Sequence, residues 1–473
     1  MRRDRWRRHW KLVVGYPVVL ALLVGLFGAS RVRAFSSSNE RSAAIVTQDV
    51  RGTGDLFDTT VAHSIAVRFS DGDYRRMLDD YFTSGNKGFI EADAVIDGKP
   101  VRSVGLRLKG NATLFALRSS DGRTAPRAGP AAGFGAGPPG AGPGGAPSFG
   151  TSLGTEAPET LPWLVSFDEF VKGRRYQGQR EIAIRPAQNV TRTTVLNEAF
   201  SFAALASVGE MAPAHTYVSF QVNERTPALR LVVQNPGESM TDAAYGVDGA
   251  LYKALSGGRF EDRGDDPLAY ATSFRQLTGR RHYDLQPVIS FIRWVGQASD
   301  AEFDAGLAAR LDVESFARYA ALQNLLLNFD DMAGPGQNYL LFYDGARQRF
   351  SVGAWDMNLA LSGSATQGPF DAGRFGGGGA GGPGGLGGNP LKQRFLASAT
   401  FKPLYERTYR DLYQRLFMRG GLAAIVDSLV AELALVPAEL APRANLDADV
   451  TQVRSFVTGR TKGLANNPVI IAS

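Results

Sequence analysis

The chain is best understood outward from three stretches: Asn328-Phe329-Asp330, Asn338-Tyr339-Leu340-Leu341-Phe342-Tyr343 and Trp355-Asp356-Met357-Asn358. Together they combine two carboxylates and several amides within a short part of the sequence. The residues before the first stretch carry apolar side chains at helical spacing, and Asp312 is a favourable N-cap for that helix. We therefore expect a helix that delivers the first stretch at its C-terminal end.

The second and third stretches frame a predicted β-hairpin. Residues 338–343 fit one strand, Asp344-Gly345 turns the chain, and residues 349–355 return with alternating apolar side chains. An antiparallel return brings Asn338 close to Asp356. Carboxylate and amide oxygens that converge at the open end of a hairpin are hard ligands, which suit Mg²⁺.

The order Asp330, Asn338, Asp356 matches that of a kinase active site. In protein kinases a loop Asp orients the acceptor hydroxyl, a nearby Asn holds a metal ion, and an Asp after a hairpin holds the bridging metal. The same spacing also fits a solvated loop acid, a strand-capping Asn and a turn Asp. The residues alone leave both interpretations open.

Several motifs in the same order resemble the CotH kinase family. Beside the three stretches, Val104-Gly105-Leu106-Arg107-Leu108-Lys109-Gly110-Asn111 is similar to the family's Arg-x-Lys-Gly-Asn segment, and the likeness extends over roughly residues 57–413. The resemblance implies an α+β, atypical protein-kinase-like fold with a strand-rich N-lobe and a helix-rich C-lobe. It also implies transfer of phosphate from ATP to Ser or Thr of a protein substrate.

The resemblance further implies roles for single residues at the metal and acceptor side of the site. Asp330 would be the catalytic acid. Asn338 and Asp356 would be ligands of Mg²⁺, and Asn358 would be a third metal ligand.

The ATP-binding candidates lie elsewhere in the sequence. Leu251-Tyr252-Lys253-Ala254 is similar to the family's Leu-Tyr-Lys strand, so Lys253 is the first candidate for the nucleotide lysine and Lys109 the second. Arg107 and Asn111 complete the nucleotide-binding set, because a turn at Lys109-Gly110-Asn111 would let backbone amides and nearby cations approach phosphate.

Two departures from the family pattern favour an alternative function. Gln234 stands where the family has a Glu, which would remove a Lys–Glu pair, and Leu164 stands where a Lys is common. Glu238 is a candidate to replace the missing acid. The alternative is a catalytically inactive kinase-like binding or assembly protein of the cell envelope, and a surface structural protein is a third class.

The N-terminal residues 1–34 differ from the rest of the chain. They hold eight of the 52 basic but only one of the 46 acidic residues, which leaves the remaining chain near −1 and gives no support for nucleic-acid binding. An uncharged apolar run from Leu12 to Ala29 follows the basic residues and predicts a membrane anchor or a cleaved signal peptide. We expect a single-pass membrane protein with an extracytoplasmic domain, or a secreted protein if the signal is cleaved.

Composition also limits the chemistry and divides the chain. The absence of Cys excludes disulfides and thiolate sites, and four scattered His argue against a zinc enzyme or a His-based triad. After a linker at residues 35–56, we expect the N-lobe at residues 57–254, with a disordered Gly/Pro/Ala insert at about 119–158. The helical C-lobe follows at residues 255–473, and its Gly-rich insert at about 362–388 is either an inert loop or a mobile substrate-side flap.

Overall fold

The computed structural model describes residues 45–110, 113–119, 122–124, 153–186, 194–371 and 388–472. The predicted membrane segment within residues 1–34, the candidate Asn111 and most of both predicted inserts lie outside these ranges. Within them, no helix combines the length and the apolar character that crossing a membrane would require.

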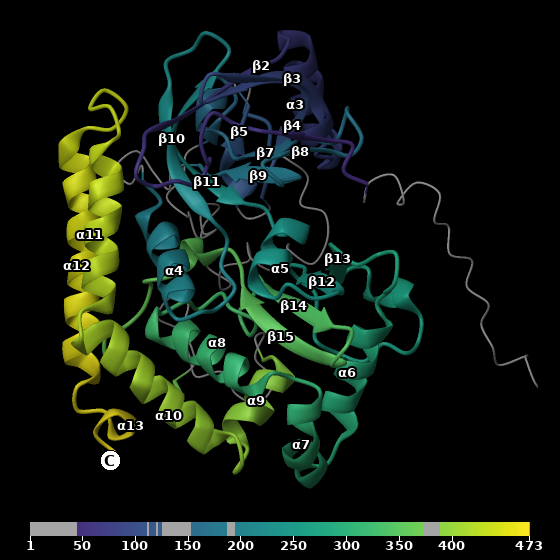
Figure 1. The fold of residues 1–473 in the computed structure, drawn as a ribbon, viewed down its shortest axis with the longest axis vertical. Helices are drawn as coiled ribbons and strands as arrows, with labels where there is room; N and C mark the ends of the chain where they lie inside the picture. The colour runs from purple at the N-terminus through teal and green to yellow at the C-terminus, as the bar shows by residue number, and fades with distance from the viewer. Residues whose placement is uncertain are drawn as a thin grey trace, which may run out of the picture. The chain divides into compact units, whose positions relative to one another are not determined.

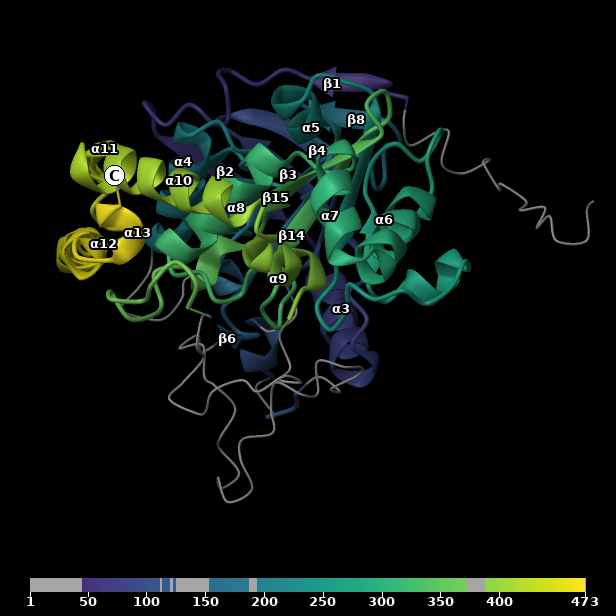
Figure 2. The ribbon, with the colours of Figure 1, turned by 90° about the horizontal axis from the view of Figure 1, so that it is seen from below.

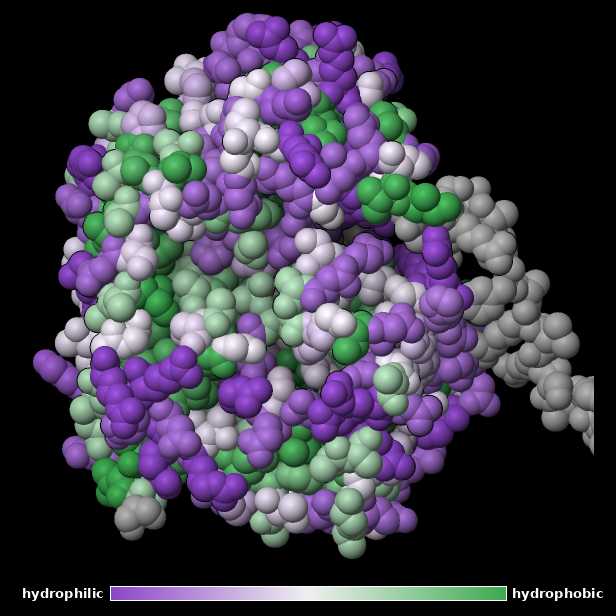
Figure 3. Space-filling view, viewed as in Figure 1, coloured by the Kyte–Doolittle hydropathy of each residue, from purple (hydrophilic) through white to green (hydrophobic). Residues whose placement is uncertain are grey.

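A closed barrel forms the first part of the described chain (Figure 1). Its strands follow the order β10-β11-β9-β7-β4-β3-β2, and the parallel pairing of β10 with β2 closes the ring. On the face in Figure 3, hydrophilic side chains predominate over this upper part. The barrel strands are β2 (His63–Arg68), β3 (Ile90–Ile96), β4 (Lys99–Leu108), β7 (Trp163–Ser166), β9 (Glu181–Ile184), β10 (His215–Val222) and β11 (Ala228–Gln234), with helix α3 (Asp71–Ser84) after β2.

Side-chain alternation explains how the barrel packs. In β3 every second side chain is buried, which is the pattern of a strand with one face in a core and one in solvent. Strand β11 is buried on both faces, because Val232 points into the barrel core while Leu231 and Val233 pack into the second core with helix α4 (Leu196–Ser207). Strands β3 and β4 pair antiparallel as one hairpin, and β10 and β11 pair antiparallel as another.

A second sheet has the order β13-β12-β14-β15 and contains the predicted hairpin. Tyr339 pairs with Ala354 and Asp344 with Arg349, so the hairpin is confirmed with its open end at Asn338. Strand β12 pairs with β14, so Lys253 lies on the same sheet as the hairpin. The strands are β12 (Gly249–Ala254), β13 (Phe274–Gln276), β14 (Tyr339–Asp344) and β15 (Arg349–Ala354).

Helices cover this second sheet and continue to the end of the described chain (Figure 1). The predicted helix with Asp312 as N-cap is confirmed as α8, which packs against β15 and α10. The helices are α5 (Glu238–Ala244), α6 (Gln286–Gln297), α7 (Asp300–Gly306), α8 (Val313–Leu325), α9 (Pro390–Ala397), α10 (Lys402–Tyr413), α11 (Gly421–Ala434), α12 (Arg443–Leu464) and α13 (Pro468–Ile471), with a π-helical turn at Gln414–Met418.

Helices α11 and α12 lie side by side in both views (Figures 1 and 2) and reach the barrel as well as the helical part. The carboxylate of Glu432 on α11 accepts hydrogen bonds from Thr216 Oγ1 at 3.0 Å and from the Tyr217 backbone N–H at 2.9 Å. Asp449 on α12 accepts one from Thr194 Oγ1 at 2.6 Å. The C-terminal helices therefore connect the barrel, α4 and the helical part.

Two of the remaining strands lie where the sequence predicted no regular structure. Residues 48–50, expected to be linker, form a strand that pairs in parallel with β8, and Leu153–Gly154, within the predicted first insert, form a strand that pairs in parallel with β5. These elements are β1 (Gln48–Val50), β5 (Leu117–Arg118), β6 (Leu153–Gly154), β8 (Arg174–Tyr176) and the 3-10 turns η1 (Thr113–Ala116), η3 (Pro158–Thr160), η4 (Pro267–Tyr270), η5 (Leu307–Ala309) and η6 (Met357–Leu359).

Candidate functional site

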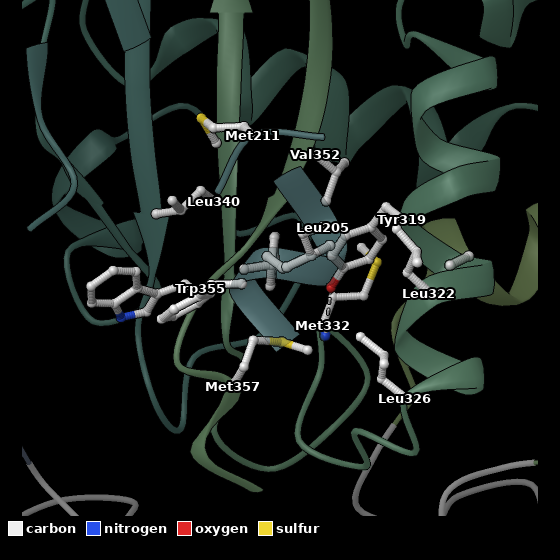
Figure 4. Packing of buried hydrophobic residues seen from close by; sticks show 14 of the residues in the cluster. Leu205, Met211, Tyr319, Leu322, Leu326, Met332, Leu340, Val352, Trp355 and Met357 are labelled. Carbon is white, nitrogen blue, oxygen red and sulfur yellow. Dashed lines mark hydrogen bonds between the residues drawn. The ribbon is translucent and has the colours of Figure 1, made fainter. Parts of the chain in front are cut away.

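The first motif stretch leaves α8 through a fixed turn. Leu327 has a φ of 49°, in the left-handed region that non-glycine residues rarely adopt, and such backbone strain is concentrated at functional sites. Asn328 is buried and donates a hydrogen bond of 2.7 Å to Gln323 Oε1. Beyond the site residues, the Met332 N–H donates to Tyr319 Oη at 3.2 Å (Figure 4). Both ends of the loop are thus tied to α8.

Asp330 is held between a glycine turn and the start of β14. Its carboxylate accepts hydrogen bonds from the Gly336 backbone N–H and, at 2.8 Å, from Asn338 Nδ2. A Cβ atom on Gly336 would lie 2.3 Å from Asp330 Oδ2, so this close approach requires glycine. Burial raises the pKa of Asp330 to about 7, with further contributions from the charges of Asp356 and Asp331.

Asp356 follows β15 in a strained conformation. Its φ is 56°, so the chain turns sharply directly after Trp355 and presents the carboxylate at the open end of the hairpin. Asp356 Oδ1 lies 3.2 Å from Arg185 Nη2. This oxygen is buried and has no hydrogen-bond partner among the described residues, so its capacity to accept is available to a ligand.

Three cations surround the indole ring of Trp355. Lys253 Nζ lies 5.1 Å, Arg185 Cζ 5.4 Å and Lys109 Nζ 5.6 Å from the ring centroid. Figure 4 shows the Trp355 ring directed away from Tyr319. Burial lowers the pKa of Lys253 to about 8, and burial with the neighbouring charges of Lys253 and Arg185 lowers the pKa of Lys109.

Arg185 and Glu198 form a buried ion pair that the motif comparison did not identify. Arg185 directly follows β9, and its guanidinium donates a hydrogen bond of 2.5 Å to Oε1 of Glu198 on α4. Glu198 is completely buried, and burial raises its pKa to about 7. The sequence signal was weak, because a Glu in the first turn of a helix is ordinarily a solvent-exposed residue that complements the helix dipole.

The other predicted site residues also have defined positions. The Arg107 guanidinium lies over the Phe89 ring at 5.1 Å from its centroid. Asn358 lies in η6, and its backbone carbonyl accepts a hydrogen bond of 2.5 Å from Asn197 Nδ2 on α4. Lys87, which sequence reasoning did not select, donates to the Gly110 carbonyl at 2.7 Å, and burial lowers its pKa to about 8.

One cavity of about 690 Å³ brings these residues together. Its wall includes the ends of β4 and β9, the start of α4, strand β12, the open end of the hairpin and part of α12. Every described candidate lines it: Arg107, Lys109, Lys253, Asp330, Asn338, Asp356 and Asn358, joined by Lys87, Arg185 and Glu198.

The residues that depart from the family pattern lie in different places. Gln234 is not itself part of the cavity wall, but its side-chain amide donates to Gln179 Oε1 at 3.1 Å and to Ser239 Oγ at 3.3 Å, and both of these residues line the cavity. Leu164 is buried in the cavity wall on β7. Glu238 is exposed and lines the cavity at the start of α5.

The residues around Asp356 fit a magnesium ion held jointly by protein and phosphate. The described ranges contain no group of three His, Cys, Asp or Glu that could hold a metal. Mg²⁺ is commonly bound through one or two carboxylates together with substrate phosphates and water, so such a group is not required. Asp356 Oδ1, which accepts no hydrogen bond within the described ranges, supplies a suitable oxygen donor, together with Asp330 and the amides of Asn338 and Asn358 on the same cavity.

Comparison with known protein families gives a match over most of the chain. The family model described as CotH kinase protein matches residues 152–463. No curated protein matches the chain. Among solved structures, the chain is similar to a chain of the HipA–HipB–operator DNA complex of the Shewanella oneidensis MR-1 toxin–antitoxin system, at 11% identity and a TM-score of 0.28, over 60% of this chain and 57% of that one.

The family match includes all three motif stretches, the ion pair of Arg185 with Glu198, and Lys253. It spans well over half of the sequence. The chain therefore belongs to the CotH kinase protein family.

Proposed function

We propose that the protein is an ATP-dependent, magnesium-requiring protein kinase that transfers the γ-phosphoryl group to a Ser or Thr hydroxyl. One observation carries the proposal: Asp330, Asp356 and the lysines Lys109 and Lys253, from four separate segments, line one cavity. Phosphoryl transfer needs little covalent chemistry from a protein, and depends mainly on positioning and on compensation of charge. The cavity contains the groups for both tasks.

The residues divide between the metal and the phosphate chain. Asp356, Asn338 and Asn358 would hold Mg²⁺, which when bound bridges phosphate oxygens and neutralises their charge. Lys109 and Lys253 would donate hydrogen bonds to phosphate oxygens. Arg185 would face the same anion while Glu198 holds its guanidinium in place.

Asp330 would orient the acceptor hydroxyl and accept its proton. Its carboxylate is fixed by Gly336 and Asn338, so it needs no reorganisation when the substrate arrives. The pKa of about 7 lies near neutral pH, where a carboxylate is an effective proton acceptor.

A second candidate is a kinase-like protein that binds nucleotide without transferring phosphate. Leu164 favours it, because this apolar side chain occupies the cavity wall where a Lys would contribute positive charge. Gln234 gives it less support, since its amide bonds to the lining residues Gln179 and Ser239 but does not itself line the cavity.

We propose further that the acceptor is an envelope or secreted protein. This rests on the basic residues and the apolar run within residues 1–34. Such an acceptor requires the main domain of this protein to lie outside the cytoplasm, and protease treatment of intact cells tests that location. Digestion of the main domain without lysis supports the location, and full protection contradicts it.

The kinase proposal is tested with the full-length protein, Mg²⁺, an envelope-protein extract and ATP labelled at either the α or the γ phosphate. We expect γ-label in protein, abolished in Asp330→Asn and Asp356→Asn and retained in Asp427→Asn, whose side chain is 67% exposed on α11. Incorporation of α-label instead would mean nucleotidyl transfer. Binding of ATP with neither label transferred would favour the second candidate.

A further inference from the structure

Trp355 contacts the three cations of the cavity from a fixed position. Lys109 follows β4, Arg185 follows β9 and Lys253 lies on β12, so the cations come from both the barrel and the second sheet. All three lie less than 6 Å from the ring centroid, the range in which a cation is attracted to an aromatic face. Trp355 itself is 1% exposed and directly precedes the proposed metal ligand Asp356.

The ammonium group of Lys253, a half-buried residue of the cavity wall, has few partners of its own. Within the described ranges, no group accepts a hydrogen bond from Lys253 Nζ; its contacts are the indole face and the longer-range charge of Asp356. An ammonium group has three N–H donors, and those of Lys253 are available to a ligand in the cavity. Lys109 Nζ donates to Asn235 Oδ1 at 2.9 Å, which leaves further donors available. Both lysines are thus arranged for an anionic partner in the cavity.

An aromatic face suits this task better than a carboxylate. A carboxylate beside the lysines would accept their hydrogen bonds and compete with phosphate for the same N–H groups. The indole attracts the positive charge through its electron-rich face and leaves the donors free. It also opposes the mutual repulsion of the three cations while no anion is bound.

We propose that Trp355 is a positioning residue that holds the ammonium groups of Lys253 and Lys109 toward the cavity, ready to bind the phosphate chain of a nucleotide. The inference rests on the proposed function, because it assigns the phosphate chain to this end of the cavity. In this role Trp355 itself would touch neither the metal ion nor the acceptor hydroxyl.

The test measures binding of inorganic tripolyphosphate to the full-length protein by calorimetry between pH 6.5 and 9. We expect Trp355→Leu to bind about 10-fold more weakly and Trp355→Phe to fall between it and the unsubstituted protein. The pH at which affinity is half lost should also move downward in Trp355→Leu, because the lysines lose a group that stabilises their charged form. Trp294→Phe is the matched control, because Arg310 Cζ lies 4.3 Å from the centroid of the Trp294 ring and this pair is not part of the cavity wall. The substitution should change neither the affinity for tripolyphosphate nor its pH dependence.

Two results would overturn the inference. One is a folded Trp355→Leu protein with unchanged affinity and unchanged pH dependence, and the other is an unsubstituted protein that does not bind tripolyphosphate at pH 6.5. If Trp355→Leu does not fold, Trp355→Phe decides, with about 3-fold weaker binding expected. Trp355-dependent binding without γ-phosphoryl transfer from ATP would contradict the kinase proposal alone.

Discussion

The guanidinium of Arg460, on helix α12, donates a hydrogen bond of 2.9 Å to Asn324 Oδ1 near the end of α8. Arg460 is completely buried, and its other acceptors are uncharged: the Tyr409 hydroxyl and the carbonyls of Asn324, Leu325, Ala365 and Gln367. One side chain therefore ties the helix that leads to Asp330 to the segment that follows Asn358.

Substitution of Arg460 by Met should destabilise the protein strongly. It would leave several buried carbonyls without donors, and each unsatisfied buried group costs about 1–3 kcal/mol. We expect the free energy of unfolding in urea to fall by at least about 3 kcal/mol. Arg454→Met is the control, because that side chain is 57% exposed and should change stability by less than about 0.5 kcal/mol. Equal effects of the two substitutions would contradict the role assigned to Arg460.

Asp330→Asn should abolish transfer yet stabilise the metal-free protein at alkaline pH. The folded-state pKa of about 7 lies above the ordinary value of 3.8, so the associated stability is present below pH 3.8 and is lost as the pH rises through 7. The Asn side chain cannot ionise, so the variant does not lose stability in this way as the pH rises. We expect it to be about 1–3 kcal/mol more stable than the unsubstituted protein at pH 8, and the gain to shrink at pH 5. A gain independent of pH would contradict this assignment.

Gly336→Ala should impair the site without unfolding the protein. Its Cβ would meet Asp330 Oδ2 at 2.3 Å and Asn338 Nδ2 at 2.8 Å, which displaces the carboxylate and the amide together. We expect phosphoryl transfer to fall by about 100-fold or more, because small displacements of positioned groups have effects of this size. In Gly296→Ala, where a Cβ meets nothing within 4 Å, activity should be unchanged. Normal activity in Gly336→Ala would show that the close contact between Gly336 and the Asp330 carboxylate is not needed for catalysis.

Arg185 and Glu198 should be energetically coupled. Arg185→Met would leave Glu198 buried without its cation, at a cost of about 3 kcal/mol. Adding Glu198→Gln should recover much of that loss, so a double-mutant cycle at pH 8 should give a coupling of about 2 kcal/mol. Since the pKa of Glu198 is about 7, the coupling should weaken at pH 6, where its carboxyl is largely protonated. Additive effects at pH 8 would argue against the pair.

His63, which does not line the cavity, should also make the free energy of unfolding depend on pH. Its Nδ1 lies 2.8 Å from Asp97 Oδ2 and its Nε2 lies 2.8 Å from the Asp58 carbonyl, so both nitrogens face acceptors. The hydrogen bond to Asp97 raises the pKa of His63 above 6.5, and the resulting stability is present below pH 6.5 and lost as the pH rises through the folded-state pKa. The stability lost in His63→Gln should therefore be larger at pH 6 than at pH 9. The exposed His282→Gln is the control.

Local patterns predicted much of this architecture. The hairpin at residues 338–355 and the helix capped by Asp312 follow from periodicity and turn residues, which act over a few positions. The ordered motifs then indicated which polar residues belong to one site. The structure places all of the described ones on one cavity, including Lys253, whose strand pairs with β14.

Other features depend on long-range packing and had no local signal. The pairing of Arg185 with Glu198 requires α4 to lie against the end of β9. Arg460 lies on a helix with the polar composition of a solvent-exposed segment, yet it is completely buried. Residues 362–371, at the start of the predicted Gly-rich insert, are held by Arg460, by Asn324 and by the Tyr405 hydroxyl, which donates to the Pro369 carbonyl at 2.6 Å.

The contacts of Arg460 have a consequence for the order of events during synthesis. This residue emerges from the ribosome more than 100 residues after Asp356. Since domains fold progressively as the chain grows, the barrel and the hairpin can form while the arginine is still missing. Asn324 and residues 365–367 then lack their shared donor, so the nascent chain should pass through a stage in which the fold is largely present but the site is unfinished. Release of α12 would set the moment at which the candidate site becomes complete.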